Sequence, residues 1–478
     1  MKQVFDALLQ HAQTRPHDIA FEDDAGRITW QDLATRVERL ARDLDAIDGV
    51  VAIGLAGGID YVVADLALTV SAKRQVPLPF FFSMAQNAHV LMDAKVSAVV
   101  TNTPELFAAL PVLTLISTHV NPSGPLKLRA YAGGAERIIY TSGSSGTPKG
   151  VVLGDRQLDA SITALSRVIA AGPADIHLSI LPLAQLLEQI CGIFLPIVAG
   201  ARTVFRFEAT KTLFGAPIAP LVAAFEDTRP TTSLLAPAIL GRWLEALGDR
   251  RAPDSLRFVA VGGASSAPSM IHKALAAGVP IHEGYGLSEC CAVVAMNTPG
   301  DAHPGTVGPV LDGLNVTLDD GEIVVSGPTV MSGYLNGAAA PDVWRTGDLG
   351  HFEGNRLVID GRKDALLVTG SGRNVSPEWV EQRVNADPRV VSSGLGLRKT
   401  DGALILIVVA AAPVGLGQIE HYLADLPSYA RPSEVIVTDP SEPGLLFPVG
   451  TPNRSVVASI INSRRAVALA RPAERIVS

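Results

Sequence analysis

The sequence has few charged residues, few cysteines and no apolar run long enough to cross a membrane. Charged residues make up 18% of its 478 residues and hydrophobic residues 47%, a balance that excludes intrinsic disorder, collagen and coiled coil. The apolar stretches Ile190 to Ala201 and Ala403 to Gly417 fall short of the roughly 18 residues that span a bilayer. The composition therefore predicts a globular protein, not an integral membrane protein, in which these stretches are buried.

Cysteine and positive charge are also scarce. Only Cys191, Cys290 and Cys291 occur, and the N-terminus has one lysine followed by Asp6 without an apolar signal core, so we expect a reducing, cytoplasmic location. With 39 basic and 47 acidic residues, the net charge of -8 argues against a general nucleic-acid surface. No His/Asp constellation accompanies the cysteines, so we expect buried thiols and no nucleophile.

Apolar spacing predicts alternating helices and strands in the first three hundred residues. An amphipathic helix begins after Thr29, with Asp32 completing a capping-box pattern. Short β-rich runs then alternate with longer Ala- and Leu-rich segments; the runs are Val50 to Leu55, Ala98 to Thr101, Ile138 to Tyr140, Thr203 to Phe205 and Arg257 to Val261. Because these runs are continuously apolar, they favour a parallel sheet covered by helices on both faces, with ligands at the strand ends.

The pattern changes in the last third of the chain. From about Gly305, short strands and close turn signals predict a β-rich subdomain. The segment from Ile359 to Gly372 is rich in glycine and charge, and another αβ pattern follows it. We therefore expect a hinge between two domains in this segment.

A segment rich in glycine and hydroxyl groups directly follows the predicted strand at Ile138. It runs Thr141-Ser142-Gly143-Ser144-Ser145-Gly146-Thr147-Pro148-Lys149. Glycines allow close backbone approach, hydroxyl and amide groups donate hydrogen bonds, and the lysine adds positive charge, so the segment predicts a loop for a polyphosphate. It is not a Walker A motif, because Thr147 and Pro148 separate Gly146 from Lys149. The alternative is a flexible Ser/Gly linker.

Several further segments occur in an order that resembles the acyl-adenylate-forming (AMP-dependent synthetase/ligase) superfamily. They are Val261 to Ala264, Gly284 to Glu289, Gly321 to Pro328, Trp344 to Leu349 and Asp360 to Arg362. The resemblance spans roughly residues 25 to 460 and implies an α/β fold. It implies a large N-terminal domain of two αβ-layered sheets plus a distorted β-barrel (1–359), a hinge (360–364) and a small mobile α+β C-terminal domain (365–478).

The resemblance also implies a role for each matching residue. Residues Thr141 to Lys149 would hold the β- and γ-phosphates of ATP, Glu289 would hold Mg2+ and Ser288 would lie near the α-phosphate. Asp348 and Arg362 would hold the ribose hydroxyls. The adenine would lie against Gly262, Gly263, Ala264 and Tyr285, and Gly286 would also belong to the ATP-binding residues. Taken alone, Glu289 could be a solvated carboxylate, and Asp348 with Arg362 a surface ion pair.

The implied reaction has two steps. A substrate carboxylate attacks the α-phosphorus of ATP to give an acyl-AMP and pyrophosphate, and a thiol then displaces AMP. The thiol is the pantetheine of CoA or of an acyl carrier protein. Because two anions meet in the first step, positioning and positive charge are the main catalytic tools. The C-terminal domain rotates between the steps, and family comparison puts the hinge at Asp364.

One departure from the family pattern concerns the C-terminal domain. Most relatives end this domain with a Gly-Lys pair and an arginine three residues later, the lysine bridging the substrate carboxylate and the α-phosphate. The matching stretch here is Gly450-Thr451-Pro452-Asn453-Arg454, with threonine in place of lysine. Adenylation could therefore be slow, with Arg454, Arg464 or Arg465 as substitutes, or the chain could be a relative that only binds nucleotide or acyl group.

The identity of the acid rests on the segment Leu181 to Glu188. It resembles the fatty-acyl-CoA synthetase form, with Ala184 and Gln185 expected to line the acyl pocket. A mostly apolar slot also fits an aryl acid such as a hydroxybenzoate. We therefore expect a fatty acid and keep an aryl acid as the alternative. The aromatic run Phe80 to Phe82 is expected to lie in the core.

Overall fold

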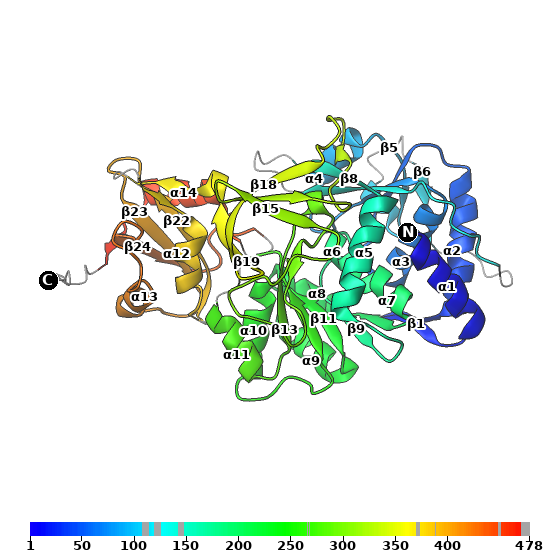
Figure 1. Cartoon of the computed structure of the whole chain (residues 1–478), viewed down its shortest axis with the longest axis horizontal. Coiled ribbons are helices and arrows are strands. Elements are labelled where there is room, and N and C mark those ends of the chain that lie inside the picture. Colours follow the sequence, from blue (N-terminus) through cyan, green and yellow to red (C-terminus); the bar gives the residue numbers. More distant parts are fainter. Residues whose placement is uncertain are drawn as a thin grey trace.

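The structure is a computed structural model, and it shows two units side by side along the longest axis (Figure 1). It describes residues 1–107, 114–118, 126–141, 148–264, 266, 268–369, 373–387, 389–447 and 451–469. The larger unit contains the blue, cyan and green segments, and the smaller one contains the orange and red segments. Within the described residues, no helix is long and apolar enough to cross a membrane.

An eight-stranded sheet forms one layer of the larger unit. Its spatial order is β14-β13-β12-β11-β9-β10-β1-β2. The strands are β1 (Ile19–Asp23), β2 (Gly26–Thr29), β9 (Ile176–Ser179), β10 (Arg202–Phe205), β11 (Thr232–Leu235), β12 (Phe258–Val261), β13 (Ile281–Tyr285) and β14 (Ala295–Met296). The strands from β13 to β1 are parallel, whereas β2 and β14 are antiparallel edges. The carboxyl ends of the parallel strands therefore lie along one edge of the layer.

A seven-stranded sheet forms the second layer, with the order β17-β8-β7-β4-β3-β5-β6. The strands are β3 (Val50–Ile53), β4 (Arg74–Pro77), β5 (Val96–Val100), β6 (Thr114–Ile116), β7 (Glu136–Thr141), β8 (Lys149–Gly154) and β17 (Gly333–Tyr334). The hairpin β7–β8 is antiparallel, and the short strand β17 pairs antiparallel with β8. A segment from the last third of the chain is thereby fixed to the predicted phosphate hairpin.

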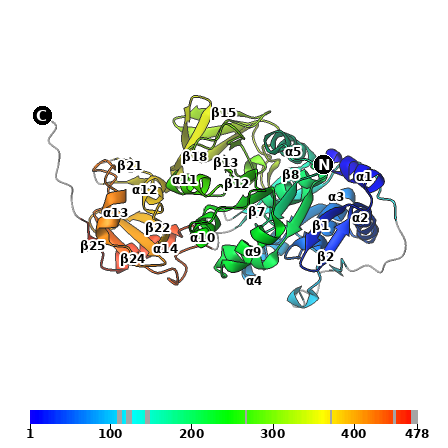
Figure 2. The ribbon, with the colours of Figure 1, turned by 90° about the horizontal axis from the view of Figure 1, so that it is seen from below.

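Helices pack around and between these sheets (Figure 2). Those of the larger unit are α1 (Lys2–Thr14), α2 (Trp30–Asp45), α3 (Gly58–Val70), α4 (Met84–Asp93), α5 (Asp155–Ile169), α6 (Leu186–Gln189), α7 (Leu195–Ala199), α8 (Phe207–Thr210), α9 (Ala219–Thr228), α10 (Pro237–Leu247) and α11 (Pro268–Ala276). The Thr29 side chain accepts a hydrogen bond from Asp32 N, as the predicted cap requires. One apolar core continues from α1 through both sheets.

An antiparallel sheet follows the eight-stranded layer. It contains β15 (Asn315–Asp319), β16 (Glu322–Ser326), β18 (Val343–Glu353) and β19 (Arg356–Arg362), in that spatial order. Its core contacts Cys290 and the end of β13 through Tyr285. This sheet forms the predicted β-rich part and ends at Arg362, where the chain enters the smaller unit.

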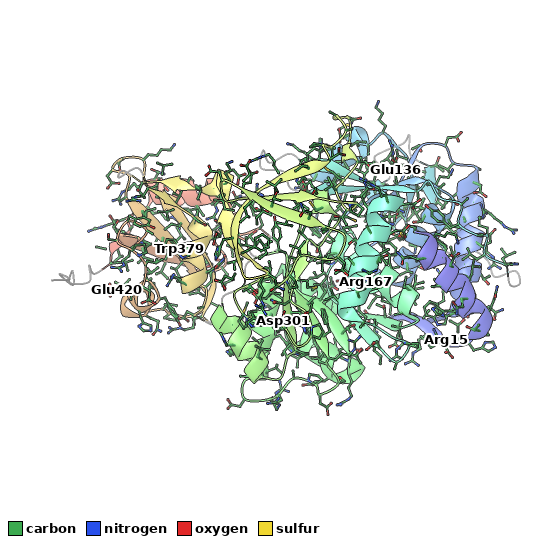
Figure 3. The ribbon with its side chains drawn as sticks, viewed as in Figure 1. Arg15, Glu136, Arg167, Asp301, Trp379 and Glu420 are labelled. Carbon is green, nitrogen blue, oxygen red and sulfur yellow. The ribbon has the colours of Figure 1, made fainter. Side chains whose placement is uncertain are left out.

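The smaller unit has its own apolar core. It is built on a four-stranded sheet in the order β22-β23-β24-β25, with a two-stranded ribbon beside it. Its elements are β20 (Leu367–Val368), β21 (Asn374–Val375), α12 (Pro377–Val384), β22 (Val390–Leu397), β23 (Leu404–Ala410), α13 (Leu416–Tyr422), β24 (Glu434–Thr438), α14 (Arg454–Ser463) and β25 (Val467–Ala468). Trp379 and Glu420 are labelled in this unit in Figure 3, and Asp301, Arg167 and Arg15 in the larger one.

The predicted α/β class, with its parallel layers and its small α+β unit, is confirmed. All five β-rich runs named from the sequence are strands, with ends that shift by a residue or two. The prediction for Phe80 to Phe82 is wrong in part. Phe80 is 36% exposed, and its ring packs edge-on against Phe207 and Phe214 at the surface of the larger unit.

Candidate active site

The phosphate hairpin lies at the carboxyl edge of the seven-stranded sheet. Thr141 pairs with Lys149 at the open end of β7–β8, and the predicted loop residues Ser142, Gly143, Ser144, Ser145, Gly146 and Thr147 lie outside the described residues. Helix α4 supports the hairpin, since His89 Nε2 lies 3.2 Å from the Pro148 carbonyl oxygen and the Tyr140 hydroxyl donates to Asp93 at 2.6 Å. The base of the loop is thereby fixed.

The Lys149 ammonium lies over an aromatic ring. Its Nζ is 5.6 Å from the centroid of Tyr334, the last residue of β17. The hydroxyl of the same tyrosine donates to Glu289 Oε1 at 2.7 Å. A lysine, a tyrosine and a glutamate from three distant segments therefore form one continuous group, which we call the Lys149 group.

Glu289 lies in a tight turn directly after β13. A 3-10 turn covers Ser288–Cys290, and the next two residues, Cys291 and Ala292, have positive φ angles of 53° and 84°. The turn closes over Gly286, where an added Cβ would lie 1.6 Å from the Ala292 carbonyl oxygen. Glycine is therefore required at this position, because no side chain fits between the two backbone segments.

A second group contains three of the predicted nucleotide-binding residues. The Tyr285 hydroxyl donates to Asp348 Oδ2 at 2.5 Å, and Arg362 Nη1 donates to Asp348 Oδ1 at 3.0 Å. Asp348 and Arg362 are register partners on β18 and β19, so the sheet itself places them together. We call these residues the Asp348 group; three residues of sequence separate its Tyr285 from Glu289 of the Lys149 group.

Burial dominates the electrostatics of both groups. It raises the pKa of Asp348, although the hydrogen bonds from Tyr285 and Arg362 oppose this shift. Burial also raises the pKa of the Tyr285 hydroxyl far above its ordinary value. Burial and the bond to Glu289 raise the pKa of Tyr334 in the same direction, while the charge of Arg362 opposes them. Both phenols therefore stay protonated near neutral pH and act as hydrogen-bond donors.

The predicted adenine segment follows β12, next to β13 in the parallel sheet. Gly262 approaches the Gly284 carbonyl oxygen so closely that an added Cβ would lie 3.3 Å from it, and Gly263 has a φ of +84°. Gly263 and Ala264 are exposed. The backbone here is exposed next to the end of β13, which carries Tyr285, and a flat ring could pack against it.

The predicted acyl segment lies inside the molecule. Ala184 is buried, and Gln185 is half-buried at the start of α6, which continues through a π-helix (Ile190–Phe194) into α7. A cavity of about 210 Å³ adjoins this segment and is lined in part by Leu181, Pro182 and Leu183. The cavity lies at the carboxyl ends of β1, β9 and β10, the edge at which parallel sheets bind ligands.

The buried acidic residue of this segment is Glu188. Its Oε1 accepts a hydrogen bond from the Ser179 hydroxyl and lies 3.4 Å from His177 Nε2. The other oxygen, Oε2, is buried without a hydrogen-bond partner in the described structure. This acid therefore connects α6 to β9 through Ser179 and His177.

The predicted C-terminal residues have partners inside the smaller unit. Arg454 donates to Glu378 and Glu381 of α12, so its charge is already paired there. Thr451 is half-buried, and its carbonyl oxygen accepts a hydrogen bond from Phe447 N at 2.9 Å. Arg464 pairs with Glu442 at the surface.

The predicted hinge residue is held by the larger unit. Asp364 accepts two hydrogen bonds from Arg362, at 3.0 and 3.1 Å, and the adjacent Lys363 donates to Glu322 Oε2 at 3.0 Å.

The two adjacent cysteines carry protonated thiols. Burial is the main cause, because it raises the pKa of Cys291 to about 12 and that of Cys290 still further. Both cysteines are fully buried, as predicted.

Sequence reasoning missed Tyr334. The residue follows glycine in a two-residue strand, a pattern too short to predict any structure. Its pairing with β8 and its bond to Glu289 depend on contacts between segments far apart in the sequence. The one local signal was its position soon after Gly327-Pro328, which is among the segments that carry the family resemblance.

The donor set fits a magnesium–polyphosphate substrate. Glu289 offers a carboxylate, the hard oxygen ligand that Mg2+ prefers, and within the described residues its side chain accepts one hydrogen bond, at Oε1. Lys149 lies at the mouth of the phosphate hairpin and forms no ion pair with any described residue. Two sheets of mainly parallel strands, a glycine-rich hairpin and a carboxylate beside the strand ends are together typical of a nucleotide-binding α/β enzyme.

Comparison with known proteins identifies the family. The model of the AMP-binding enzyme family matches residues 8–335, and the chain belongs to this family. The resemblance to the acyl-adenylate-forming superfamily is thus confirmed, and with it the class of AMP-forming ligase.

Curated relatives resemble the chain over most of its length. The 2-succinylbenzoate–CoA ligase of Bacillus licheniformis is 26% identical, over 89% of this chain and 94% of the relative. The indoleacetate–CoA ligase of Aromatoleum aromaticum is 27% identical, over 90% and 93%.

Solved structures show the same fold. O-succinylbenzoate coenzyme A synthetase from Bacillus subtilis, in complex with AMP, superposes with a TM-score of 0.81 at 22% identity, covering 97% of this chain and 99% of that one. The anthranilate CoA ligase AuaEII, in complex with anthranoyl-AMP, gives a TM-score of 0.84 at 18% identity, covering 96% and 97%. Both similarities extend across the large and the small unit.

Proposed function

We propose that the protein activates an aryl carboxylic acid with MgATP, through an acyl-AMP, and transfers the acyl group to CoA. The observation that carries the proposal is that the Lys149 group and the Asp348 group lie near enough for the charge of Arg362 to act on the Tyr334 hydroxyl, in a fold shared with CoA ligases. Family membership supplies the reaction class, and the two groups supply the charges that such a reaction needs.

The first step brings two anions together. One oxygen of the substrate carboxylate forms a bond to the α-phosphorus, the bond from that phosphorus to the bridging oxygen breaks, and pyrophosphate leaves with the electron pair. Lys149 would neutralise phosphate charge, Glu289 would hold the Mg2+ that accompanies ATP, and Ser288 would lie near the α-phosphate. Asp348 would accept the ribose hydroxyls, with Arg362 holding its carboxylate in place.

In the second step the CoA sulfur forms a bond to the acyl carbon and AMP leaves, while the thiol proton is released to solvent. A rotation of the small domain would separate the two steps, as the family resemblance implies. We propose domain boundaries at residues 1–359 and 365–478, with Asp364 as the pivot. The bonds from Arg362 to Asp364 are those that such a rotation would break or remake.

An aryl acid is preferred over a fatty acid. Relatives with similar coverage act, by their names, on 2-succinylbenzoate and indoleacetate, and a solved relative holds anthranoyl-AMP. The fatty-acid prediction gains no support from these comparisons, and neither does an acyl carrier protein as acceptor. Ala184 and Gln185 would line the acyl slot beside Leu181 to Leu183.

A second candidate function is nucleotide or acyl binding without turnover. It is favoured by Thr451, which puts a neutral hydroxyl where most relatives have a lysine. Arg454 is unsuited to replace that charge in the present orientation, because Glu378 and Glu381 already pair with it.

A pyrophosphate-release screen tests the proposal. Purified protein with MgATP and CoA is given benzoate, hydroxybenzoate, anthranilate, 2-succinylbenzoate, indoleacetate and saturated fatty acids of several lengths. We expect acid-dependent pyrophosphate release with at least one aryl acid, and consumption of CoA with matching AMP production. Release with fatty acids alone would overturn the aryl assignment, and binding of ATP without any release would favour the second candidate.

A further inference from the structure

Tyr334 joins two charged residues that the sequence places far apart. Its hydroxyl donates to Glu289 Oε1 at 2.7 Å, and its ring lies 5.6 Å below the Lys149 ammonium. The ammonium and the carboxylate form no ion pair with each other, although both belong to the described part of the chain. The phenol thus lies between opposite charges that could otherwise neutralise one another.

The backbone holds this tyrosine rigidly against both partners. Tyr334 pairs with Val151 on β8, two residues from Lys149, and Leu335 N donates to the Gly150 carbonyl oxygen at 2.7 Å. On the other side, Met331 N donates to the Glu289 carbonyl oxygen at 2.8 Å. One short segment therefore connects the phosphate hairpin to the Glu289 turn.

The ring is also fixed by packing. Trp344 of β18 lies edge-on to it, with centroids 5.9 Å apart and an interplanar angle of 72°. A phenol in this position can do two things at once. Its face attracts a cation, and its hydroxyl orients a carboxylate without cancelling the negative charge.

We propose that Tyr334 is a positioning residue that holds Glu289 and Lys149 apart, so that both charges remain available to the magnesium and the phosphates of ATP. This inference deepens the proposed function and rests on it for the identity of the substrate. Without the hydroxyl, the Glu289 carboxylate is no longer held in one orientation, and the site would lose part of its affinity for the metal complex, while the ring still separates Glu289 from Lys149.

The test compares Tyr334→Phe with the unaltered protein by isothermal titration calorimetry, once with MgATP and once with ATP in EDTA. Phenylalanine keeps the ring under Lys149 and removes the bond to Glu289. We expect the Kd for MgATP to rise about tenfold, the value for one charge-assisted hydrogen bond, with the Kd for metal-free ATP unchanged. In the pyrophosphate assay, the Mg2+ concentration for half-maximal rate should rise in the same proportion.

A second variant separates the ring from the hydroxyl. Tyr334→Leu removes both, so it should also weaken binding of metal-free ATP, because Lys149 then reaches Glu289 directly. The control is Tyr131→Phe, which deletes a hydrogen bond of 2.7 Å to Asp155 away from the two groups. This control should bind MgATP normally.

Two results would overturn the inference. Normal MgATP affinity in Tyr334→Phe would show that the hydroxyl does not position Glu289, and an equal loss for MgATP and metal-free ATP would indicate a purely structural role. Since the binding assay needs no acid, it still tests Tyr334 if the protein releases no pyrophosphate, an outcome that counts against the proposed function alone.

Discussion

Asp348 accepts hydrogen bonds from a tyrosine and an arginine while it is almost fully buried, an arrangement that costs free energy unless the charge is used. We expect Asp348→Asn to raise the KM for ATP about tenfold, because a charged acceptor contributes more than a neutral one, by about 1.5 kcal/mol. Steady-state kinetics at saturating acid measure this change.

The control for that experiment is Asp312→Asn. Asp312 forms an ion pair with Arg167 in which both side chains are open to solvent, so its loss should leave the KM for ATP unaltered. An unchanged KM for ATP in Asp348→Asn would show that the Asp348 carboxylate does not contribute to nucleotide binding.

Glu283 gives a second prediction at the residue scale, concerning pH. Burial raises its pKa to about 7, although Gly305 N donates to its carboxylate. The folded state therefore prefers the protonated acid. This difference in pKa contributes to the free energy of unfolding in full below about pH 4.5, the usual pKa of a glutamate. The contribution is lost as the pH rises through the folded-state pKa of about 7, and the total loss is about 3 kcal/mol at most.

Replacement by glutamine should remove this dependence. We expect Glu283→Gln to match the unaltered protein near pH 5 and to melt at a higher temperature at pH 8. Thermal unfolding at the two pH values measures the difference, and parallel pH profiles for both proteins would contradict the assignment.

The turn after β13 is the element on which the site depends. It closes over Gly286 so tightly that even a methyl group cannot be accommodated, and two of its other residues adopt left-handed conformations. We expect Gly286→Ala to displace Glu289, to reduce pyrophosphate release at least about a hundredfold and to destabilise the fold by about 3 kcal/mol.

Gly172→Ala is the matched control, because nothing lies within 4 Å of its added Cβ and its φ is not in the left-handed region. It should leave both activity and melting temperature close to those of the unaltered protein. If Gly286→Ala behaves like this control, the turn does not set the position of Glu289.

The elements also show what sequence can and cannot predict. Strands β3, β5, β7, β10 and β12 each contain a short β-rich run that is mostly apolar, and this local pattern predicts them, as the local signal at Thr29 predicts a helix cap. Tyr334 and the exposure of Phe80 depend on which distant segments meet, and no window of sequence contains that information. The site residues within ordered motifs were predictable through resemblance, whereas the residue that joins them was not.

The whole molecule consists of a large unit that contains both groups and a small unit that contains Thr451. If the missing charge limits adenylation, Thr451→Lys should speed pyrophosphate release about tenfold or more, since a lysine can contact the developing charge when the small domain closes. Single-turnover measurement with excess protein isolates this step.

The control is Thr451→Met, because methionine is similar to lysine in side-chain length but carries no charge. It should not raise the rate of pyrophosphate release. A fall in rate with lysine would mean that another group occupies its place, and it would redirect attention to Arg464 or Arg465. An identical rate in all three proteins would show that chemistry in the first step does not depend on this position.

Strand β17 has a further consequence for the molecule as a whole. It covers the outer side of β8 and ends the seven-stranded sheet with only two residues, Gly333 and Tyr334. An outermost strand so short presents almost no free backbone groups to which a foreign chain could add. The tyrosine that contacts Lys149 and Glu289 thus also helps to keep neighbouring molecules from joining sheet to sheet at high concentration.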